Sequence, residues 1–309
     1  MRQIEIIEIE ELLAGRGPEK IVVHTTGSTG SEKVIELTRE NLIASATAAH
    51  QFLGAKKGDV WSLLLPTNHI AGINVLARSL ILESNLVDVN GKADFTAIVP
   101  TQLFQALNGD EKLLTHLQGC KAVLVGGAAT SDSLIEQAKR NGITVVTTYG
   151  STETCGGCIY DRTPLAGVEV RVNDEGLLEI KGQMIFTSGW YTTSDLVTIE
   201  DGKVSILGRN DDVIISGGEN ISLAQIENLL ANKFPNQNFV AVGIPDEKWG
   251  SKLCLLSDKD MEISDVSELL SVRIGKHGIP KEFLSPIAIP LKGIGKPDRV
   301  AVSQLFLNK

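Results

Sequence analysis

Residues Thr144–Thr154, TVVTTYGSTET, carry the clearest indication of the fold class. It begins with a β-branched, apolar run, which is typical of a buried strand, and continues directly into a turn rich in hydroxyl groups. Apolar runs of the same kind occur earlier in the chain, at residues 20–25, 60–65, 94–99 and 122–125. Helical stretches separate these runs, so the sequence predicts an α/β fold with a mainly parallel sheet covered by helices on both faces.

The clearest helical stretch is Thr38–Phe52. Thr38 is a good N-cap candidate, and Asn41 stands at the third helical position, where a Glu or Gln would complete a capping box. In sheets of this kind, ligands bind in the loops at the carboxyl ends of the strands. The loops that follow the predicted strands are therefore the first candidates for a functional site.

Two other patterns follow along the chain. Residues 163–207 alternate short strands with turn residues, which predicts a small β-rich subdomain. After residue 207 the sequence predicts an α+β domain, with helices at Ser222–Phe234 and Ser264–Ile274, each capped by its serine, and strands at 239–244 and 252–256. We therefore predict two domains, residues 1–207 and residues 208–309.

The composition excludes several classes of protein. The 309 residues carry a formal charge of −9, which argues against a general nucleic-acid binder, because such a protein needs basic surface. No apolar run approaches the ~20 residues that cross a bilayer, and the N-terminus is acidic where a signal peptide would be basic. The four cysteines suggest reduced thiols in a cytoplasmic protein. Cys155 and Cys158 have CxxC spacing without a second ligand pair, so we expect them in a pocket wall and not in a metal site.

The loop Thr25–Lys33, TTGSTGSEK, follows the first predicted strand. Its two glycines free the backbone to turn N–H groups toward an anion, its hydroxyls add donors, and Lys33 adds a positive charge. This chemistry suits a polyphosphate, although such a loop by itself is as often a solvated turn. It is not the GxxxxGK[ST] loop, because Gly27 and Gly30 lie three residues apart and Lys33 does not follow a glycine.

Polar loops follow other strands as well. The Tyr149 ring can stack on a purine, the Thr152 hydroxyl can bond a phosphoryl oxygen, and the Glu153 carboxylate can hold a hard cation such as Mg2+. Asp195 ends another predicted turn, TSD, where its carboxylate can accept both hydroxyls of a ribose. Three more polar loops come later, at residues 208–212, 216–220 and 293–299.

Taken in order, these loops resemble the adenylate-forming superfamily of acyl-CoA synthetases, luciferases and peptide-synthetase adenylation domains. The matching motifs TTGSTG, YGSTET, TSD, GRNDD and GIGK run from Thr25 to Arg299, nearly the whole chain. The resemblance implies a large ATP- and acyl-binding α/β domain with a small β-rich subdomain, residues 1–207, and a mobile C-terminal α+β lid, residues 208–309. It also implies ATP, Mg2+ and coenzyme A as cofactor and co-substrates.

The resemblance implies a role for each matching residue of the ATP site. The first loop would cover the phosphates, Thr152 would contact the α-phosphate, and Glu153 would hold the magnesium ion. Gly126, Gly127 and Ala128, together with Tyr149, would line the adenine pocket. The residues implied to bind ATP are Thr25, Thr26, Gly27, Ser28, Thr29, Gly30, Lys33, Gly126, Gly127, Ala128, Tyr149, Gly150, Ser151, Asp195 and Arg209.

Other matches concern the ribose, the hinge and catalysis. Asp195 and Arg209 match the positions that bind the ribose. Asp211 matches the hinge about which the small domain rotates. Lys296 matches the catalytic lysine, which contacts the reacting carboxylate and the α-phosphate oxygens.

The acid and thiol sites are implied by less specific segments. Asn68 and His69 match the acyl pocket. Gly217 and Gly218 match the CoA tunnel in the acyl-CoA synthetase version of their segment, which favours CoA over a carrier protein. The LPTNHIAG and LVGGAAT segments and the short chain are most similar to o-succinylbenzoate–CoA ligases of menaquinone biosynthesis. Their substrate carries a second carboxylate, for which Asn68, His69 and Arg78 are candidates.

Two alternatives stay open at this point. One is an adenylating ligase for another aryl or short-chain acid. The other is a non-catalytic nucleotide-binding paralogue, because only 24 residues precede the phosphate loop and Glu32 stands where the superfamily usually has a proline. The expected partners are small molecules: the carboxylic acid, ATP and CoA. Nucleic acid and a membrane span are not expected, and a homodimer is left open.

Overall fold

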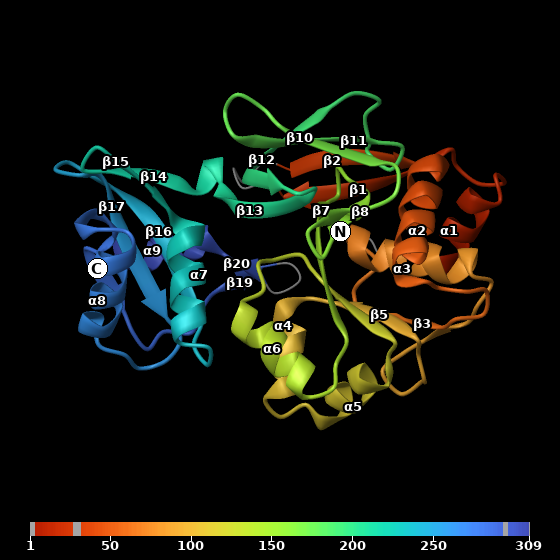
Figure 1. Cartoon of the computed structure of the whole chain (residues 1–309), viewed down its shortest axis with the longest axis horizontal. Helices are drawn as coiled ribbons and strands as arrows, with labels where there is room; N and C mark the ends of the chain where they lie inside the picture. The colour runs from red at the N-terminus through yellow and green to blue at the C-terminus, as the bar shows by residue number, and fades with distance from the viewer. Residues whose placement is uncertain (1–3, 27–31, 293–295, 309) are drawn as a thin grey trace. The chain divides into compact units, whose positions relative to one another are not determined.

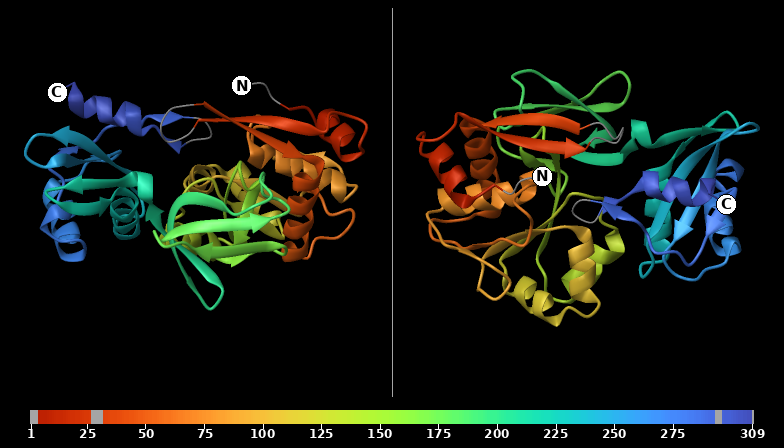
Figure 2. Two further views of the ribbon diagram at one scale, coloured as in Figure 1. Left: turned by 90° about the horizontal axis from the view of Figure 1, so that it is seen from above. Right: turned by 180° about the vertical axis from the view of Figure 1, so that it is seen from behind.

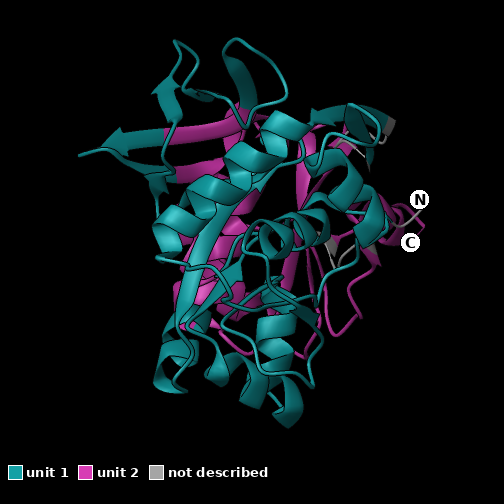
Figure 3. Cartoon of the chain, turned by 90° about the vertical axis from the view of Figure 1, so that its right-hand side faces the viewer, with its two compact units in different colours: residues 1–130, 134–193, 198–205 teal, residues 131–133, 194–197, 206–309 magenta. Residues whose placement is uncertain are grey.

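The structure is a computed structural model that describes residues 4–26, 32–292 and 296–308 (Figure 1). The chain separates into two compact units, coloured differently in Figure 3. The first unit comprises residues 1–130, 134–193 and 198–205, and the second comprises residues 131–133, 194–197 and 206–309. The assignment of ATP and acyl binding to residues 1–207 and of a moving lid to residues 208–309 stays a prediction.

A seven-stranded sheet forms the centre of the first unit, in the order β4-β3-β5-β6-β7-β8-β9. The first five of these strands run parallel, and β8 and β9 are added antiparallel at one side. The mainly parallel sheet that the sequence predicts is therefore confirmed. Its strands are β3 (Trp61–Ser62), β4 (Leu86–Val87), β5 (Phe95–Ile98), β6 (Ala122–Val125), β7 (Val145–Ser151), β8 (Gly156–Tyr160) and β9 (Thr163–Pro164).

Helices cover the sheet in two groups. One group packs its apolar side chains on the sheet through a buried cluster that includes Leu103, Leu117 and Val123. In the other group the helices pack against each other and α3 lies against β3 and β5. The first group is α4 (Pro100–Leu107), α5 (Glu111–Gly119) and α6 (Asp132–Arg140), and the second is α1 (Ile6–Leu13), α2 (Arg39–Leu53) and α3 (Ile70–Ile81).

The start of α2 confirms the predicted cap. The Thr38 side chain accepts the N–H of Asn41 at 3.3 Å, and the Asn41 side chain accepts the N–H of Thr38 at 2.8 Å. Asparagine thus closes the capping box that Glu or Gln would usually close. Gly54 ends the helix with a φ of 63°, which a residue without a Cβ adopts at little cost.

The first predicted strand is not part of the parallel sheet, and its inclusion there was wrong. β1 (Lys20–Thr26) pairs antiparallel with β2 (Glu32–Thr38), a strand that the sequence did not reveal (Figure 2). Ile21 and Val23 are buried, whereas Val22 between them is 44% exposed. Only one face of the strand is covered, which is typical of an antiparallel hairpin and not of a central parallel strand.

The β-rich segment forms a four-stranded sheet in the order β10-β11-β12-β13. Leu178 and Ile180 of β11 and Val204 of β13 are buried in it. This agrees with the short alternating strands that the sequence predicts. The strands are β10 (Val168–Val172), β11 (Leu177–Gly182), β12 (Tyr191–Glu200) and β13 (Lys203–Arg209).

The second unit contains a five-stranded sheet in the order β15-β14-β17-β16, with β18 beside β17. One buried cluster joins it to α7 and α8, and a separate cluster joins it to α9. The elements are the 3-10 turns η1 (Asn210–Asp212) and η2 (Lys276–Gly278), β14 (Val213–Ser216), β15 (Glu219–Ser222), α7 (Leu223–Lys233), β16 (Phe239–Asp246), β17 (Gly250–Ser257), α8 (Ile263–Arg273), β18 (Glu282–Leu284), β19 (Leu291–Lys292), β20 (Lys296–Pro297) and α9 (Arg299–Leu307).

One of the two predicted caps in this unit is confirmed and the other is wrong. Ser222 precedes α7 and accepts the N–H of Gln225. α8, in contrast, starts one residue before Ser264, and Glu262 is its N-cap residue. Ser264 therefore lies inside the first turn, because the helical conformation extends to Ile263. Among the described residues, no helix combines the length and the apolar character that a bilayer crossing requires.

Candidate functional site

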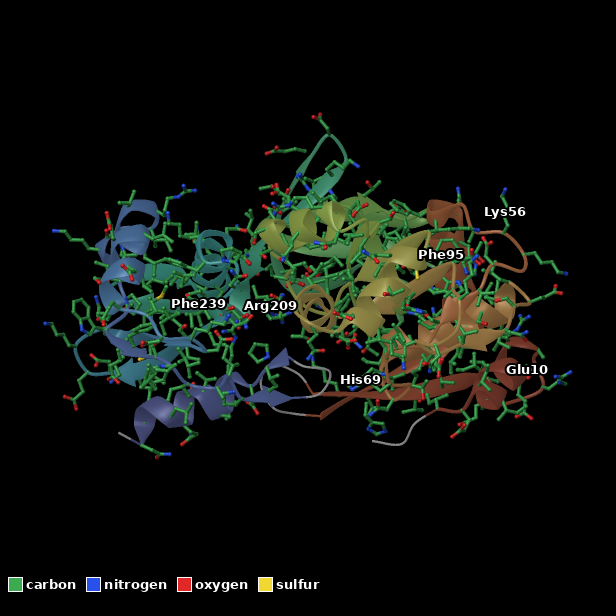
Figure 4. The ribbon with its side chains drawn as sticks, turned by 90° about the horizontal axis from the view of Figure 1, so that it is seen from below. Glu10, Lys56, His69, Phe95, Arg209 and Phe239 are labelled. Atoms are coloured by element: carbon green, nitrogen blue, oxygen red, sulfur yellow. The ribbon has the colours of Figure 1, made fainter. Side chains whose placement is uncertain are left out.

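The carboxyl edge of the parallel strands brings together several predicted site residues of the first unit. Gly126–Ala128 directly follow β6, and Tyr149–Ser151 form the end of β7, the next strand of the sheet. Asn68 and His69 lie between β3 and α3, and His69 is the N-cap residue of α3 (labelled in Figure 4). Because β3, β6 and β7 run parallel, these segments all follow the same ends of the strands.

The YGSTET motif is partly a strand and partly a turn. The prediction that Tyr149–Ser151 belong to a loop was wrong, since they extend β7 and pair with β8. The turn that follows is held by Thr154, whose Oγ1 accepts the N–H of Ser151 at 2.7 Å and donates to Gly156 O at 2.7 Å. Thr152 and Glu153 stand half-buried on this turn, so their side chains are carried on a fixed backbone.

Two glycines of the predicted ATP site are required by close packing. A Cβ on Gly126 would lie 2.2 Å from Thr148 Oγ1, and one on Gly150 would lie 2.0 Å from Gly156 O. Any side chain at either position would push neighbouring backbone apart. The glycines therefore allow the close approach of β6, β7 and β8 to one another.

Two residues that the sequence did not reveal support the same turn from α2 and α3. Ser45 Oγ and Asn74 Nδ2 both donate to Cys155 O, at 2.9 and 2.7 Å. Both side chains are buried, so they satisfy a carbonyl that water does not reach. A small polar residue on an otherwise apolar helix face was the available signal.

The predicted phosphate loop overlaps the paired strands β1 and β2 and the segment that connects them. Thr25 and Thr26 end β1, and Thr25 lies opposite Lys33 in the register. Lys33 is exposed and belongs to β2, so its prediction as a loop residue was wrong. Gly27, Ser28, Thr29 and Gly30 lie outside the described residues, as do the side chains of Thr25, Thr26 and Glu32.

The predicted ribose-binding pair is in contact in the second unit. Arg209 Nη1 lies 3.5 Å from Asp195 Oδ1, with the carboxylate largely buried and the guanidinium about half exposed. Asp195 does not end a turn as predicted, because it lies inside β12. Thr193, Asp195 and Val197 are buried in alternation, a strand pattern that the polar side chains concealed in the sequence.

The predicted hinge residue Asp211 and the predicted catalytic lysine Lys296 are described by their backbone alone. Asp211 lies in η1, directly after β13, and Lys296 begins β20, opposite Lys292 of β19. The side chains of Asp211 and Lys296 lie outside the described residues, as do residues 293–295. The backbone therefore places both positions in the second unit, and their roles stay predictions.

Gly217 and Gly218 form the tight turn between β14 and β15. Their φ angles are 62° and 87°, and the Gly217 N–H donates to Trp249 O at 2.9 Å. A Cβ on Gly217 would meet the Trp249 ring at 3.1 Å. Gly217 therefore packs against the Trp249 ring with little space for a side chain. The role of this turn in CoA binding stays a prediction.

The CxxC pair consists of buried thiols. Cys155 and Cys158 are fully buried, and burial raises the pKa of each thiol to about 12. Both are therefore protonated at neutral pH, which suits neither metal binding nor nucleophilic attack. Within the described part of the chain, no group of three or more His, Cys, Asp or Glu side chains is arranged to hold a metal ion.

Arg78 is a buried cation on α3. Only 3% of the residue is exposed, Nη2 donates to Tyr160 Oη at 2.9 Å, and the guanidinium lies 5.1 Å from the centre of the Trp61 ring. Its Nε is buried without a hydrogen-bond partner, and among the described residues no carboxylate forms an ion pair with it. A buried positive charge without an anion is costly, so this arrangement favours an anionic partner other than the described residues.

His50 lies near this cation and gives a testable pH dependence. Burial, together with the positive charge of Arg78, lowers the pKa of His50 to about 4. In the unfolded chain its pKa is about 6.5, so unfolding takes up a proton between these values. We expect the free energy of unfolding to fall by up to about 3 kcal/mol as the pH drops from about 6.5 to about 4. Chemical denaturation across this range should show the decrease in the wild type and not in His50→Asn; identical curves would contradict it.

The comparisons with known proteins agree with this geometry. The sequence profile described as AMP-binding enzyme matches residues 20–183, more than half of the chain. The chain is 32% identical to a probable 2-succinylbenzoate–CoA ligase of Mycobacterium tuberculosis, over 94% of this chain and 85% of that protein. The chain belongs to the AMP-binding enzyme family.

Two further relatives of this AMP-binding enzyme are of interest. It is 30% identical to a 2-succinylbenzoate–CoA ligase of Staphylococcus aureus, over 90% of the chain and 65% of that protein. The chain also resembles a solved structure, the o-succinylbenzoate CoA synthetase (MenE) from Bacillus subtilis in complex with the acyl-adenylate intermediate OSB-AMP. The TM-score is 0.77 and the sequence identity 25%, and the match covers 91% of this chain and 68% of that one. The adenylate-forming fold and the likeness to o-succinylbenzoate–CoA ligases are thereby confirmed.

Proposed function

We propose that this AMP-binding enzyme is an AMP-forming acid–CoA ligase that acts on o-succinylbenzoate. The names of its relatives support the reaction and the acid. The observation that carries the choice of a dicarboxylate is the buried Arg78 guanidinium, which has an unpartnered Nε and no carboxylate of the described chain beside it. A substrate with a second carboxylate would supply the missing negative charge.

The first half-reaction joins the acid to ATP. A carboxylate is a poor electrophile, so its oxygen attacks the α-phosphorus of ATP, an acyl-adenylate forms, and pyrophosphate leaves. Two anions approach each other in this step, and we assign Lys296 to neutralise the charge that develops. Glu153 stands half-buried on the turn after β7, with Thr152 beside it, and its carboxylate oxygens are of the type that would hold Mg2+. Such an ion would add further positive charge at the phosphates.

The second half-reaction transfers the acyl group to CoA. The thiol sulfur attacks the carbonyl carbon of the adenylate, AMP leaves with the bonding electrons, and the thiol proton passes to solvent. No nucleophile of the protein is required. Lys296 is needed only in the first half-reaction, which is why we assign Asp211 to a hinge and residues 208–309 to a lid that moves between the two steps.

The remaining roles follow the same reaction. We assign the segment between β1 and β2 to the phosphates of ATP, Tyr149 and the segment 126–128 to the adenine, and the pair Asp195 and Arg209 to the ribose. Asn68 and His69 are assigned to the acyl pocket, and the turn at 217–218 to CoA. A cytoplasmic location and a homodimer belong to the same proposal.

An assay of both half-reactions with a panel of acids tests the function. Purified protein with ATP, Mg2+, CoA and o-succinylbenzoate should release pyrophosphate and form a CoA thioester. Benzoate, simple aryl acids and short-chain acids serve as competitors, and turnover with these but not with o-succinylbenzoate would overturn the choice of substrate. ATP binding without turnover of any acid would instead support a non-catalytic nucleotide-binding paralogue.

A further inference from the structure

An arginine network in the second unit takes no part in the roles assigned so far. Arg299 begins α9, and its Nη1 and Nη2 donate to the two oxygens of Glu227 on α7, at 2.5 and 2.9 Å. Nη1 also donates to Ala241 O on β16 at 2.6 Å. Glu227 Oε1 in turn accepts the N–H of Ala241 at 2.8 Å. The planar guanidinium is therefore fixed on two elements at once, with the two-pronged geometry that only arginine provides.

The same side chain reaches the predicted hinge. Arg299 Nε lies 3.8 Å from Asp212 Oδ1, and Asp212 directly follows Asp211 in η1. The side chains of Arg299, Glu227 and Asp212 are 30%, 21% and 19% exposed. Water screens these pairs less than it screens fully exposed ones, so the network is stiffer than a surface salt bridge.

Lys296 is separated from this anchor by only two residues. Asp298, the residue before Arg299, caps α9 by accepting the N–H groups of Val300 and Ala301, each at 3.1 Å. The chain between β20 and the anchored start of α9 is thus short and held at its end. We therefore expect a shift of Arg299 to move the backbone of Lys296.

We propose that Arg299 is a positioning residue for adenylate formation, which fixes the Lys296 strand to the hinge segment. When the chain rotates at the hinge, this link makes Lys296 follow as part of one body. The inference rests on the proposed function, because Arg299 acts here through Lys296. A displacement of about 1 Å at a reacting group can reduce the rate ~10²-fold, so even a modest loosening of the link should be measurable.

The variant Arg299→Lys tests this role. Lysine keeps the positive charge but cannot bind Glu227 with two parallel hydrogen bonds. We expect kcat for adenylate formation to fall about 10- to 100-fold, with KM for ATP and acid little changed. Thioester formation from a synthetic acyl-adenylate should stay near the wild-type rate. Arg273→Lys, at an exposed position in the last turn of α8, is the matched control and should change neither rate.

A double variant separates positioning from a purely structural role. If Arg299 acts through Lys296, Arg299→Lys should cause no further loss of adenylate formation in a Lys296→Ala background. A further loss there, or equal losses in both half-reactions of the single variant, would overturn the proposal. Asp212→Asn removes only the hinge contact and should give a smaller loss of the same kind; no loss would overturn the link to the hinge.

Backbone hydrogen exchange tests the link without any substrate. Arg299→Lys should speed up exchange in residues 291–298 and 210–212 while leaving α8 unchanged. If exchange in both segments stays at the wild-type rate, the proposal fails even where the enzyme is active. If the wild type turns over no acid, the proposed function fails, and exchange still decides whether Arg299 joins the two segments.

Discussion

Replacing Lys296 by alanine should abolish adenylate formation and leave the second half-reaction largely intact. The first step brings a carboxylate against the α-phosphate, so the loss of one neutralising charge should slow it by ~10²–10³-fold or more. The attack of the CoA thiol on the finished adenylate does not need this charge. Pyrophosphate exchange with ATP and o-succinylbenzoate measures the first step, and CoA consumption with synthetic o-succinylbenzoyl-adenylate measures the second.

The chain offers a close control for this experiment. Lys292 lies opposite Lys296 in the β19–β20 pair, so Lys292→Ala removes an equal charge from the same hairpin. We expect that variant to keep both half-reactions near the wild-type rates. Equal losses of the two steps in Lys296→Ala, or an equal loss in Lys292→Ala, would speak against a lysine that serves one step alone.

The second large effect concerns the selectivity for the dicarboxylate. Arg78→Met keeps a long, apolar side chain in the core and removes the cation. Removing one partner of a buried ion pair costs about 3–5 kcal/mol, which corresponds to ~10²–10⁴-fold in kcat/KM for o-succinylbenzoate. An analogue that lacks the succinyl carboxylate should lose little, because it never formed the pair. The ratio of kcat/KM values for the two acids is therefore the quantity to measure.

The ratio of the two kcat/KM values also distinguishes loss of the ion pair from general damage to the core. A disturbed fold would lower the rates for both acids together, whereas loss of the ion pair lowers only one. Tyr160→Phe removes the hydroxyl to which Arg78 Nη2 donates but keeps the guanidinium, so it should preserve the selectivity. If Arg78→Met lowers turnover of both acids equally, Arg78 is a core residue alone and the distal carboxylate is bound elsewhere.

Local signals in the sequence predicted the parts of the fold that depend on local chemistry. The cap of α2 rests on two residues three positions apart, Thr38 and Asn41, and the structure has it as predicted. β6 occupies the predicted residues, because a strand buried on both faces shows as an unbroken apolar run. The glycine and hydroxyl motifs predicted the family for the same reason, since each motif is a short segment with its own chemistry.

The errors come from pairing between distant segments. The partner of β1 is decided by which face is covered, and the sequence does not show that Val22 and Val34 face away from the core. Asp195 was predicted to end a turn because the residues of TSD are polar, whereas β12 continues through them. The support of the Cys155 carbonyl by Ser45 and Asn74 depends on helix packing across more than 80 residues of sequence, so a polar residue on an apolar helix face is visible in the sequence but its partner is not.

The strand β7 pairs parallel with β6 on one side and antiparallel with β8 on the other. A parallel neighbour would need a long crossover, and such crossovers tolerate insertions, whereas the β7–β8 turn is short and closed by Thr154. Lengthening it would pull Gly150 away from Gly156, where a single extra carbon already has no room. Engineering of this enzyme toward new acids should therefore leave the β7–β8 turn untouched and vary the connection at residues 63–69, which leads from β3 into α3.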